Sequence, residues 1–506
     1  MACFVTAVHA NYAGSAVTTL LSVALVPVYI RYLGIEAYAL VGLFTVIQMW
    51  LSLLDFGMTP TLSREMARFT AGAVPVQKIR DLLRTLEILA AGVALVIIAA
   101  LWLGSDYLAY HWLNAKNLPP AAIAQAIIIM SLVVASRFCE TLWRSALFGL
   151  QQQVWWSGAQ AVLNTFRYGG AALLVAFAVP TTTAFFLWQL LASLLTLIAF
   201  GWKLYRCLPA GDRPARFSVV ALVDIRRFAA GMIGINLLAV LLTQLDKVIL
   251  SKLIPLADFG YYMLATALAG LLYALAAPVT QALSPPLVEA ATRGDTAGVA
   301  RLYHGGAQLI TVVVAPVALL LIGFGGDVML LWTGDTALSA KVAPLLALVA
   351  TGTLLNTLMQ MAYFTMVAHG WTRLSLVSNL IAVAILLPAL ALIVPRYGGA
   401  GAALVWIVLN LGYIVFLVPL LHRRILRGEM WQWYGRDVAL PLLAAVAAVA
   451  VAVVLRGQFA LSRWQLVPAL GLTWGMATLL ATLATPLVRN RLRGFAERFL
   501  PGVGAP

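Results

Sequence analysis

Charged residues are scarce in this chain: Asp, Glu, Lys and Arg together make up 10% of its 506 positions, while apolar residues make up 63%. A soluble domain of ordinary composition carries about 25% charged residues. Soluble domains have no cores that could absorb so much apolar surface, so the composition excludes an ordinary soluble protein. We conclude that lipid is the solvent for most of the chain.

Cysteine is also scarce, with only Cys3, Cys139 and Cys207 in the chain. Their spacing matches no redox or metal motif, and they fall on different predicted elements, so we expect no disulfide framework. The scattered histidines, among them His9, His304, His369 and His422, also lack the spacing of a ligand set. We therefore expect neither a metal site nor a cofactor.

The chain nevertheless carries a net charge of +15. Basic residues in a membrane protein concentrate in cytoplasmic loops, where they meet anionic lipid headgroups. We therefore expect the charge to contact membrane lipids and expect no nucleic-acid partner.

Long apolar stretches separated by short loops predict membrane-spanning helices rather than a β-barrel, whose strands would alternate apolar and polar residues. The start of the chain lacks a basic segment and a small-residue cleavage site, which favours a retained first span over a cleaved signal peptide. About fourteen spans are predicted: 10–30, 38–58, 85–104, 121–145, 158–178, 183–202, 229–251, 259–281, 305–325, 343–367, 376–394, 400–421, 438–455 and 466–487.

The distribution of Lys and Arg predicts the orientation of these spans. With a cytoplasmic N-terminus, twenty-two of the 33 basic residues fall in inside connections and the tail, and seven fall outside. The positive-inside rule therefore places both termini in the cytoplasm. We expect the membrane to be the inner (plasma) membrane. The longest connections, near 59–84 and 203–228, are basic and lie inside.

An internal repeat relates two stretches at an offset of 221 residues. Residues 31–38 align with 252–259, and residues 59–63 align with 280–284. Six predicted spans separate the two copies, an even number, so both halves point the same way across the membrane. Parallel repeats of this kind occur in transporters that bind their substrate between the halves.

Several motifs resemble a known family. Tyr32-Leu-Gly-Ile-Glu-Ala-Tyr38, Leu53-Leu-Asp-Phe-Gly57 and Ser63-Arg-Glu-Met-Ala67 resemble the opening helical hairpin of bacterial polysaccharide and O-antigen flippases. Gln244-Leu-Asp-Lys247 and Phe259-Gly-Tyr-Tyr262 resemble the start of that family's second half. These flippases belong to the multidrug/oligosaccharidyl-lipid/polysaccharide exporter superfamily. The resemblance covers roughly residues 10–420, and the last two spans match by hydropathy alone.

The resemblance implies an all-α protein with two pseudo-symmetric six-helix bundles, two additional C-terminal helices and a central cavity. The expected organisation is an N-terminal bundle at 1–202, a cytoplasmic basic linker at 203–228, a C-terminal bundle at 229–421, and two further spans with a basic tail at 422–506. The implied substrate is a polyprenyl-diphosphate-linked oligosaccharide, moved by alternating access. Polysaccharide polymerase and other biosynthesis proteins are the implied partners, and H⁺ or Na⁺ is the implied coupling ion.

Ionisable residues inside predicted spans are costly, by about 2.5–3.5 kcal/mol at a helix centre, and mark sites or internal ion pairs. Arg137, Glu140 and Arg144 follow i, i+3, i+7 spacing and so share one helical face. Arg167, in the next antiparallel span, is expected to approach the same layer. These arginines are candidates for binding a diphosphate headgroup, whose oxygens suit the guanidinium fork. The alternatives are an internal ion pair through Glu140 and an Arg144 that reaches the interface.

A second group lies in the outer half of the seventh span: Gln244, Asp246 and Lys247. Asp246 is a candidate for ion or proton coupling, and Gln244 and Lys247 are candidates for contacting the substrate. Adjacent residues on a helix point about 100° apart, so we expect Asp246 and Lys247 not to face one narrow spot. The alternative is a pair of interfacial residues that stabilises the bend before Pro255.

Asp55 ends the second span, and Arg64 follows shortly after it. Asp55 is a candidate for cation coordination or for a cytoplasmic gate closed by pairing with a nearby arginine such as Arg64; the alternative is a carboxylate that caps a turn. Lipid II flippases of the same superfamily carry arginines in the first span, whereas residues 10–30 contain none. This departure favours a glycan other than the peptidoglycan precursor.

Two other functions remain open. A drug or metabolite antiporter of the same superfamily would need an acidic cavity, whereas basic candidates outnumber acidic ones here. A membrane glycosyltransferase, polymerase or ligase would need catalytic residues on a large outer loop, and no outside connection exceeds about fifteen residues. No nucleophile–base set or phosphate-binding glycine loop is present either, so we expect a transporter rather than an enzyme.

Overall fold

The computed structural model describes residues 21–459 and 462–485. Within these residues the chain is helical, and backbone pairing of the β type is limited to one isolated bridge between Asn114 and Pro255. The all-α prediction is confirmed. Contacts divide the chain into two compact units, residues 1–260 and 261–506.

The predicted spans correspond to helices wherever the structure describes them. Ten helical stretches of the described chain are long and apolar enough to cross a membrane. One of them, Leu376–Arg424, contains two predicted spans. The first predicted span falls mostly outside the described residues and is represented by Leu21–Leu33. The helices also leave large apolar side chains on their outer faces, such as Leu103, Phe177 and Leu472. Such exposure is expected for surfaces that face lipid rather than water.

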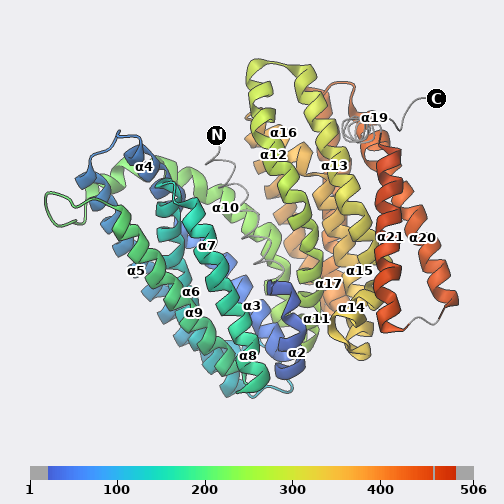
Figure 1. Ribbon diagram of the computed structural model, residues 1–506, viewed down its shortest axis with the longest axis horizontal. Coiled ribbons are helices and arrows are strands. Elements are labelled where there is room, and N and C mark those ends of the chain that lie inside the picture. The colour runs from blue at the N-terminus through green and yellow to red at the C-terminus, as the bar shows by residue number, and fades with distance from the viewer. Residues whose placement is uncertain (1–20, 460–461, 486–506) are drawn as a thin grey trace, which may run out of the picture. The chain divides into compact units, whose positions relative to one another are not determined.

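The first unit contains helices α2 to α10. Their bounds are α2 Val26–Leu33, α3 Ile35–Leu51, the 3₁₀ turn η1 Ser52–Asp55, α4 Met58–Thr70, α5 Val76–Tyr107, the π-helical turn η2 Leu108–Trp112, α6 Pro120–Gly149, α7 Gln153–Asn164, the π-helical turn η3 Thr165–Gly169, α8 Gly170–Phe177, α9 Thr182–Cys207 and α10 Val219–Leu253. Helix α6 packs against both α5 and α9 in the first unit, whose helices are coloured from blue to green in Figure 1. Apolar residues along α6, including Ile123, Met130 and Leu147, are fully buried.

Helix α10 groups with the first unit, although the boundary expected between the bundles lies before it. It packs against α3, α4 and α5. The turn that follows it is held by the connection after η2: Asn114 donates to the carbonyl of Lys252 at 3.0 Å, and its own carbonyl accepts from the amide of Leu256 at 2.9 Å. Gly260 lies so close to the backbone of Ile35 that a Cβ there would fall 2.7 Å from the Ile35 oxygen.

The connection between α9 and α10 is shorter than the linker expected at 203–228, because both helices extend into it and leave only residues 208–218 outside helices. Polar contacts attach this segment to α5. Asp81 accepts from the Arg213 guanidinium at 2.7 Å and from the Arg216 amide at 2.9 Å. Arg80 donates to the carbonyl of Pro209 at 2.8 Å.

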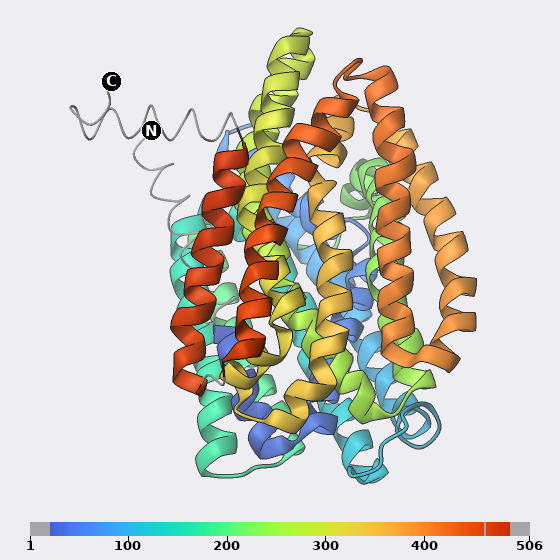
Figure 2. The same cartoon turned by 90° about the vertical axis from the view of Figure 1, so that its right-hand side faces the viewer.

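The second unit begins within α11. Its helices are α11 Leu256–Ala269, α12 Leu271–Arg293, α13 Thr296–Gly323, α14 Gly325–Thr333, α15 Thr336–Leu358, α16 Gln360–Ala368, α17 Thr372–Gly412, the π-helical turn η4 Tyr413–Leu417, α18 Val418–Arg424, α19 Met430–Gln432, the π-helical turn η5 Trp433–Ala439, α20 Leu440–Gln458 and α21 Arg463–Ala484. Helix α13 packs against α12, α15, α20 and α21. The terminal helices α20 and α21 run side by side, as the red helices of Figure 2 show.

Helix α17 is a hairpin of two spans rather than one straight helix. Gly398 interrupts it with φ 54° and ψ −136°, a conformation that favours glycine. Tyr413 donates from its hydroxyl to Asn379 at 3.1 Å, although 34 residues separate them in sequence. A straight helix would hold these residues about 50 Å apart, so the chain turns back at Gly398. The two spans predicted at 376–394 and 400–421 are its two arms.

Candidate substrate cavity in the first unit

A cavity of about 750 Å³ lies inside the first unit. Its lining comes from η1, α4, α6, η3 and α10, together with the ends of α3 and α7. The volume falls within the range of about 300–1,000 Å³ that is usual for small-molecule sites. Three arginines and two carboxyl groups line it: Arg137, Arg144, Arg167, Asp55 and Glu140. Its ionised lining therefore carries net positive charge.

The prediction that Arg137, Glu140 and Arg144 share a helical face is confirmed, since all three line this cavity from α6. Arg137 is held by uncharged groups: its guanidinium donates to Gln48 at 3.0 Å and to Gln189 at 3.3 Å. It also lies 5.1 Å from the centre of the Phe44 ring, within the range of a cation–π contact. The described residues place no carboxylate within ion-pair distance of Arg137. Its charge is therefore oriented by amides and a ring without being neutralised.

Arg167 approaches the same layer, as expected from the antiparallel arrangement. It is 4% exposed and donates to the hydroxyl of Thr196 at 3.2 Å. Its guanidinium lies 3.7 Å from Glu140 Oε2, too far for a hydrogen bond. The ion pair thus forms between Glu140 and Arg167, two residues of adjacent helices. Of the three arginines that line the cavity, Arg167 is the one that pairs with Glu140.

Local structure explains how Arg167 is presented to the cavity. It lies in η3, a π-helical turn inside the fifth predicted span. A π turn frees backbone carbonyls, and membrane helices tolerate this where neighbouring donors replace the lost bonds. Trp188 donates to the carbonyl of Phe166 at 3.1 Å, and Tyr29 donates to that of Tyr168 at 2.7 Å. These two bonds stabilise the irregular turn around Arg167.

Asp55 lies at the cavity where η1 meets α4. Its carboxylate accepts from the amide of Thr59 at 3.2 Å and from the Thr59 hydroxyl. Phe56 and Gly57 between them adopt left-handed conformations, which turn the chain sharply into α4. Asp55 therefore caps the turn and faces the cavity at once, so the capping and the coupling interpretations are compatible.

Arg64 lies further along α4, where its guanidinium donates to Glu65 at 2.9 Å. Arg68 donates to the same carboxylate at 3.0 Å. Arg64 is not part of the cavity lining. Its role as a gate stays a prediction.

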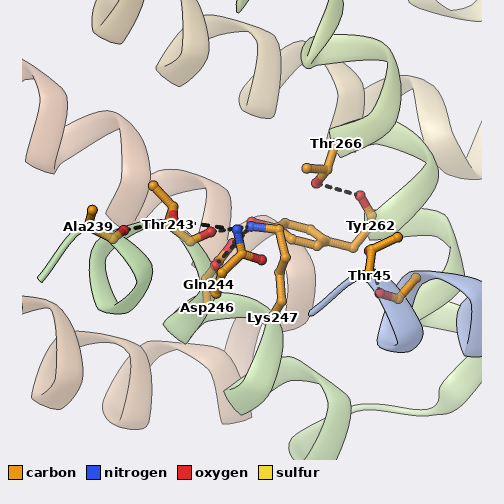
Figure 3. A network of polar contacts seen from close by, with 9 residues as sticks. Thr45, Ala239, Thr243, Gln244, Asp246, Lys247, Tyr262 and Thr266 are labelled. Carbon is orange, nitrogen blue, oxygen red and sulfur yellow. Dashed lines mark hydrogen bonds and ion pairs between the residues drawn. The ribbon is translucent and has the colours of Figure 1, made fainter. Parts of the chain in front are cut away.

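The second predicted group forms a cluster of its own on α10. Lys247 donates to the carbonyl of Thr243 at 2.6 Å, and its ammonium lies 3.2 Å from Asp246 Oδ1 (Figure 3). The expectation that Asp246 and Lys247 could not meet at one spot is wrong. The flexible four-carbon stem of lysine lets its ammonium fold back over the turn toward the neighbouring carboxylate. Gln244 donates weakly to the Thr243 hydroxyl at 3.4 Å.

Neutral polar residues complete the cavity, and sequence reasoning did not select them. Gln48, Thr59, Gln160, Asn164 and Tyr168 all line it. Glutamine and asparagine are unremarkable near span ends, and their partners lie far along the chain, as the 89-residue separation of Arg137 and Gln48 illustrates. The sequence offered one signal for these residues, which is that Gln48 and Asn164 are polar residues inside predicted membrane spans.

The solved structures that this helical arrangement resembles are those of membrane transporters. The lipid II flippase MurJ in an inward closed conformation matches with a TM-score of 0.72, 13% identity, and coverage of 95% of this chain and 99% of that one. An inward-facing multidrug resistance MATE transporter matches with a TM-score of 0.63, 14% identity, and coverage of 80% and 96%. A MOP superfamily transporter from Pyrococcus furiosus matches with a TM-score of 0.53, 14% identity, and coverage of 85% and 95%.

Residues 8–291 match the family model described as polysaccharide biosynthesis protein. The match covers more than half of the sequence, so the chain belongs to the polysaccharide biosynthesis protein family. The resemblance inferred from the hairpin motifs is thereby confirmed. A search of curated proteins found no match.

Proposed function

We propose that this protein is a flippase that moves a polyprenyl-diphosphate-linked oligosaccharide from the cytoplasmic to the periplasmic leaflet by alternating access. The observation that carries the proposal is the gathering of Arg137, Arg144 and Arg167 around one cavity with an incomplete set of carboxylates. A diphosphate brings negative charges that match this excess. Membership of the polysaccharide biosynthesis protein family supports a glycan cargo.

The chemistry of the lining fits both parts of such a headgroup. Guanidinium groups bind phosphate oxygens through paired, charge-assisted hydrogen bonds. The amide and hydroxyl side chains of Gln48, Gln160, Asn164 and Tyr168 offer the neutral donors and acceptors that a sugar needs. The polyprenyl tail would stay in the bilayer throughout, because its apolar surface gains nothing from entering a polar cavity.

Arg137 is the residue best prepared for phosphate. Two amide oxygens and the Phe44 ring fix its guanidinium, so little side-chain freedom is lost when an anion binds. Arg167, paired with Glu140 at 3.7 Å, can exchange that long contact for a shorter one with phosphate.

The proposal is tested by flipping of defined polyprenyl-diphosphate sugars in proteoliposomes. Arg137→Gln and Arg167→Ala should each lower the initial rate by about tenfold or more, because a charge-assisted hydrogen bond contributes about 1.5–3 kcal/mol. Arg293→Ala is the matched control, since the Arg293 side chain is 73% exposed and its ion pair is with Glu289 on its own helix. Wild-type rates in both cavity variants, with folded protein, would overturn the assignment.

The antiporter alternative makes the opposite prediction in the same vesicles. A cationic drug would be repelled by three arginines and attracted by Glu140 and Asp55. The antiporter would be favoured if uptake of a cationic dye increased in Arg137→Gln and fell in Glu140→Gln. The diphosphate sugar would then not be flipped.

A further inference from the structure

A second cluster of buried polar residues lies in the second unit, where α13 packs against η5. Nδ1 of His304 on α13 contacts the Oδ2 atom of Asp437 on η5. The other oxygen of Asp437 accepts from the Gln308 side-chain amide at 2.8 Å. His304 is 3% exposed and the Asp437 side chain is completely buried. Both lie inside helical stretches apolar enough to cross a membrane, where isolated charges are rare.

A second carboxylate faces the opposite side of the same imidazole. Nε2 of His304 lies 3.2 Å from Oε2 of Glu429, within ion-pair distance although not aligned as a hydrogen bond. A neutral imidazole carries a proton on only one nitrogen, so it can donate to only one of two carboxylates. With both carboxylates ionised, the second nitrogen would present a lone pair to a negative charge. The geometry is satisfied when the cluster holds one additional proton.

The surroundings favour a proton over a metal ion as the ligand. The described residues contain no group of three or more His, Cys, Asp or Glu side chains that could hold a metal. Among the described residues, the titratable groups around His304 and Asp437 include Tyr303, His422 and Tyr434. Tyr434 donates to the carbonyl of Ile414 at 2.6 Å, and His422 Nδ1 contacts the carbonyl of Val418 at 2.8 Å. No lysine or arginine of the described chain forms an ion pair with Asp437 or Glu429.

Several buried polar atoms around the pair have no hydrogen-bond partner, and they belong to Tyr303, His304, Gln308, His422 and Trp433. Buried polar groups of a folded protein are usually satisfied. The cluster therefore contains donors and acceptors that can take part in further hydrogen bonds. Asp437 also lies in a π-helical turn, a feature frequent at functional sites.

We propose that His304, Asp437 and Glu429 form a proton-binding site of the second unit. Glu429, whose side chain is 36% exposed, takes a proton from solvent and passes it to Nε2 of His304. The imidazolium then donates from Nδ1 to Asp437 and from Nε2 to Glu429, and the charge of the cluster changes from −2 to −1. Release runs through the same atoms in reverse. Protonation thus strengthens the link between α13 and η5, the segment that leads into α20.

Proton binding here does not depend on the cargo, and only its use in driving transport rests on the proposed flippase function. The test therefore reads the site directly. The chain contains five histidines, so ¹⁵N-histidine labelling of the full-length protein in lipid nanodiscs gives few ring signals. His304→Gln identifies the signals of His304 by their loss. We expect the wild-type His304 nitrogens to change between the neutral and imidazolium shifts in a titration from about pH 9 to about pH 5.

The two carboxylate variants test the mechanism. Asp437→Asn and Glu429→Gln should each move the His304 transition to lower pH by about one pH unit or more. Each variant removes a neighbouring carboxylate whose negative charge stabilises the imidazolium. Glu429 is partly exposed, so its variant remains informative if the fully buried Asp437→Asn protein does not fold. Asp327→Asn is the control, since it breaks a different contact of α20, the paired bonds of Asp327 with Arg456 at 3.0 and 3.1 Å. It should leave the transition unchanged.

The proton site would be overturned if the His304 signal did not change over this pH range. It would also be overturned if the transition in Glu429→Gln occurred at the same pH as in the wild type. In either case the contact is purely structural. Flipping measured on the same preparations separates the two proposals. Absence of flipping at every pH with a normal His304 transition contradicts the flippase function and leaves the proton site standing. Normal flipping without a His304 transition contradicts the proton site and leaves the flippase function standing.

Discussion

At the residue scale, carboxylates neutralise only part of the positive charge of the arginines that line the cavity. Glu140 is the carboxylate nearest to Arg167, at 3.7 Å, and Asp55 is engaged with Thr59. Arg137 is held by amides instead. A fully paired set would stabilise the fold and leave no charge for a ligand, whereas an unpaired set would be costly in a membrane. The cavity lies between a fully paired and a fully unpaired set of arginines, since Arg167 has a carboxylate partner and Arg137 has amide partners.

Glu140→Gln tests this balance. The variant removes one negative charge from the cavity, so a diphosphate headgroup should bind more tightly and leave more slowly. We expect the apparent KM for a polyprenyl-diphosphate sugar to fall and the maximal flipping rate to fall with it. Flipping kinetics over a range of substrate densities measure both values. An increase in KM would show that Glu140 contacts the cargo favourably.

Glu36 is a second residue with a clear energetic role. Its buried carboxylate accepts from three successive backbone amides, those of Lys116, Asn117 and Leu118, at 3.0, 2.9 and 2.9 Å. Glu36→Ala leaves these donors without their acceptor, and we expect a loss of about 2–3 kcal/mol in stability. A thermal unfolding scan of the purified protein measures it. Glu289→Ala, at an exposed pair on one helix, should leave the scan unchanged.

At the element scale, close helix packing sets limits on substitution. A Cβ added at Gly149 would lie 2.4 Å from the Ser63 carbonyl oxygen and 2.5 Å from Met66 Cβ. Gly149 therefore lets α6 approach α4, the helix that follows Asp55. Small residues at such crossings are usual in membrane helices.

Gly149→Ala should force α4 and α6 apart and cost about 1–3 kcal/mol. Gly158→Ala is the matched control, because nothing lies within 4 Å of a Cβ at that helical position. Alanine favours helix over glycine by about 1 kcal/mol, so this control should be neutral or slightly stabilising. Thermal unfolding of the two variants compares them directly, and equal midpoints would contradict the packing argument.

The connection at 208–218 gives a further test at this scale. Asp81 holds Arg213 and the backbone of Arg216, and Arg216, which precedes Phe217, is a site for trypsin. Asp81→Asn should release the segment and accelerate cleavage there several-fold, as followed by gel electrophoresis of the intact protein in detergent. Asp106→Asn, on the same helix α5 far from this connection, should cleave at the wild-type rate.

Much of the element scale was predictable, because a span needs only length and hydropathy. The arms of α17 at 376–394 and 400–421 illustrate this. The i, i+3, i+7 spacing of Arg137, Glu140 and Arg144 also fixed their common face. The partners of these residues were not predictable, since Gln48, Gln189 and Thr196 come from other helices. The contact of His304 with Asp437 spans 133 residues, and no local pattern encodes it.

At the scale of the whole molecule, the distribution of basic residues predicts which connections face the cytoplasm. Alkaline phosphatase, which is active only outside the cytoplasm, reports this orientation. A fusion after Arg427 should be inactive and a fusion after Phe459 should be active. The reverse result would place the protein upside down and would invert the proposed direction of transport.

The central claim is that the arginine-lined cavity of the first unit binds the diphosphate headgroup. Thr141 lines that cavity, so Thr141→Cys in a protein whose three native cysteines are replaced reports its occupancy by reaction with a maleimide. A polyprenyl-diphosphate sugar should slow this reaction, while polyprenyl alcohol should not, and a cysteine at the exposed Gln458 should react equally with and without ligand. Equal labelling of Thr141→Cys in the presence and absence of saturating diphosphate sugar would contradict the account.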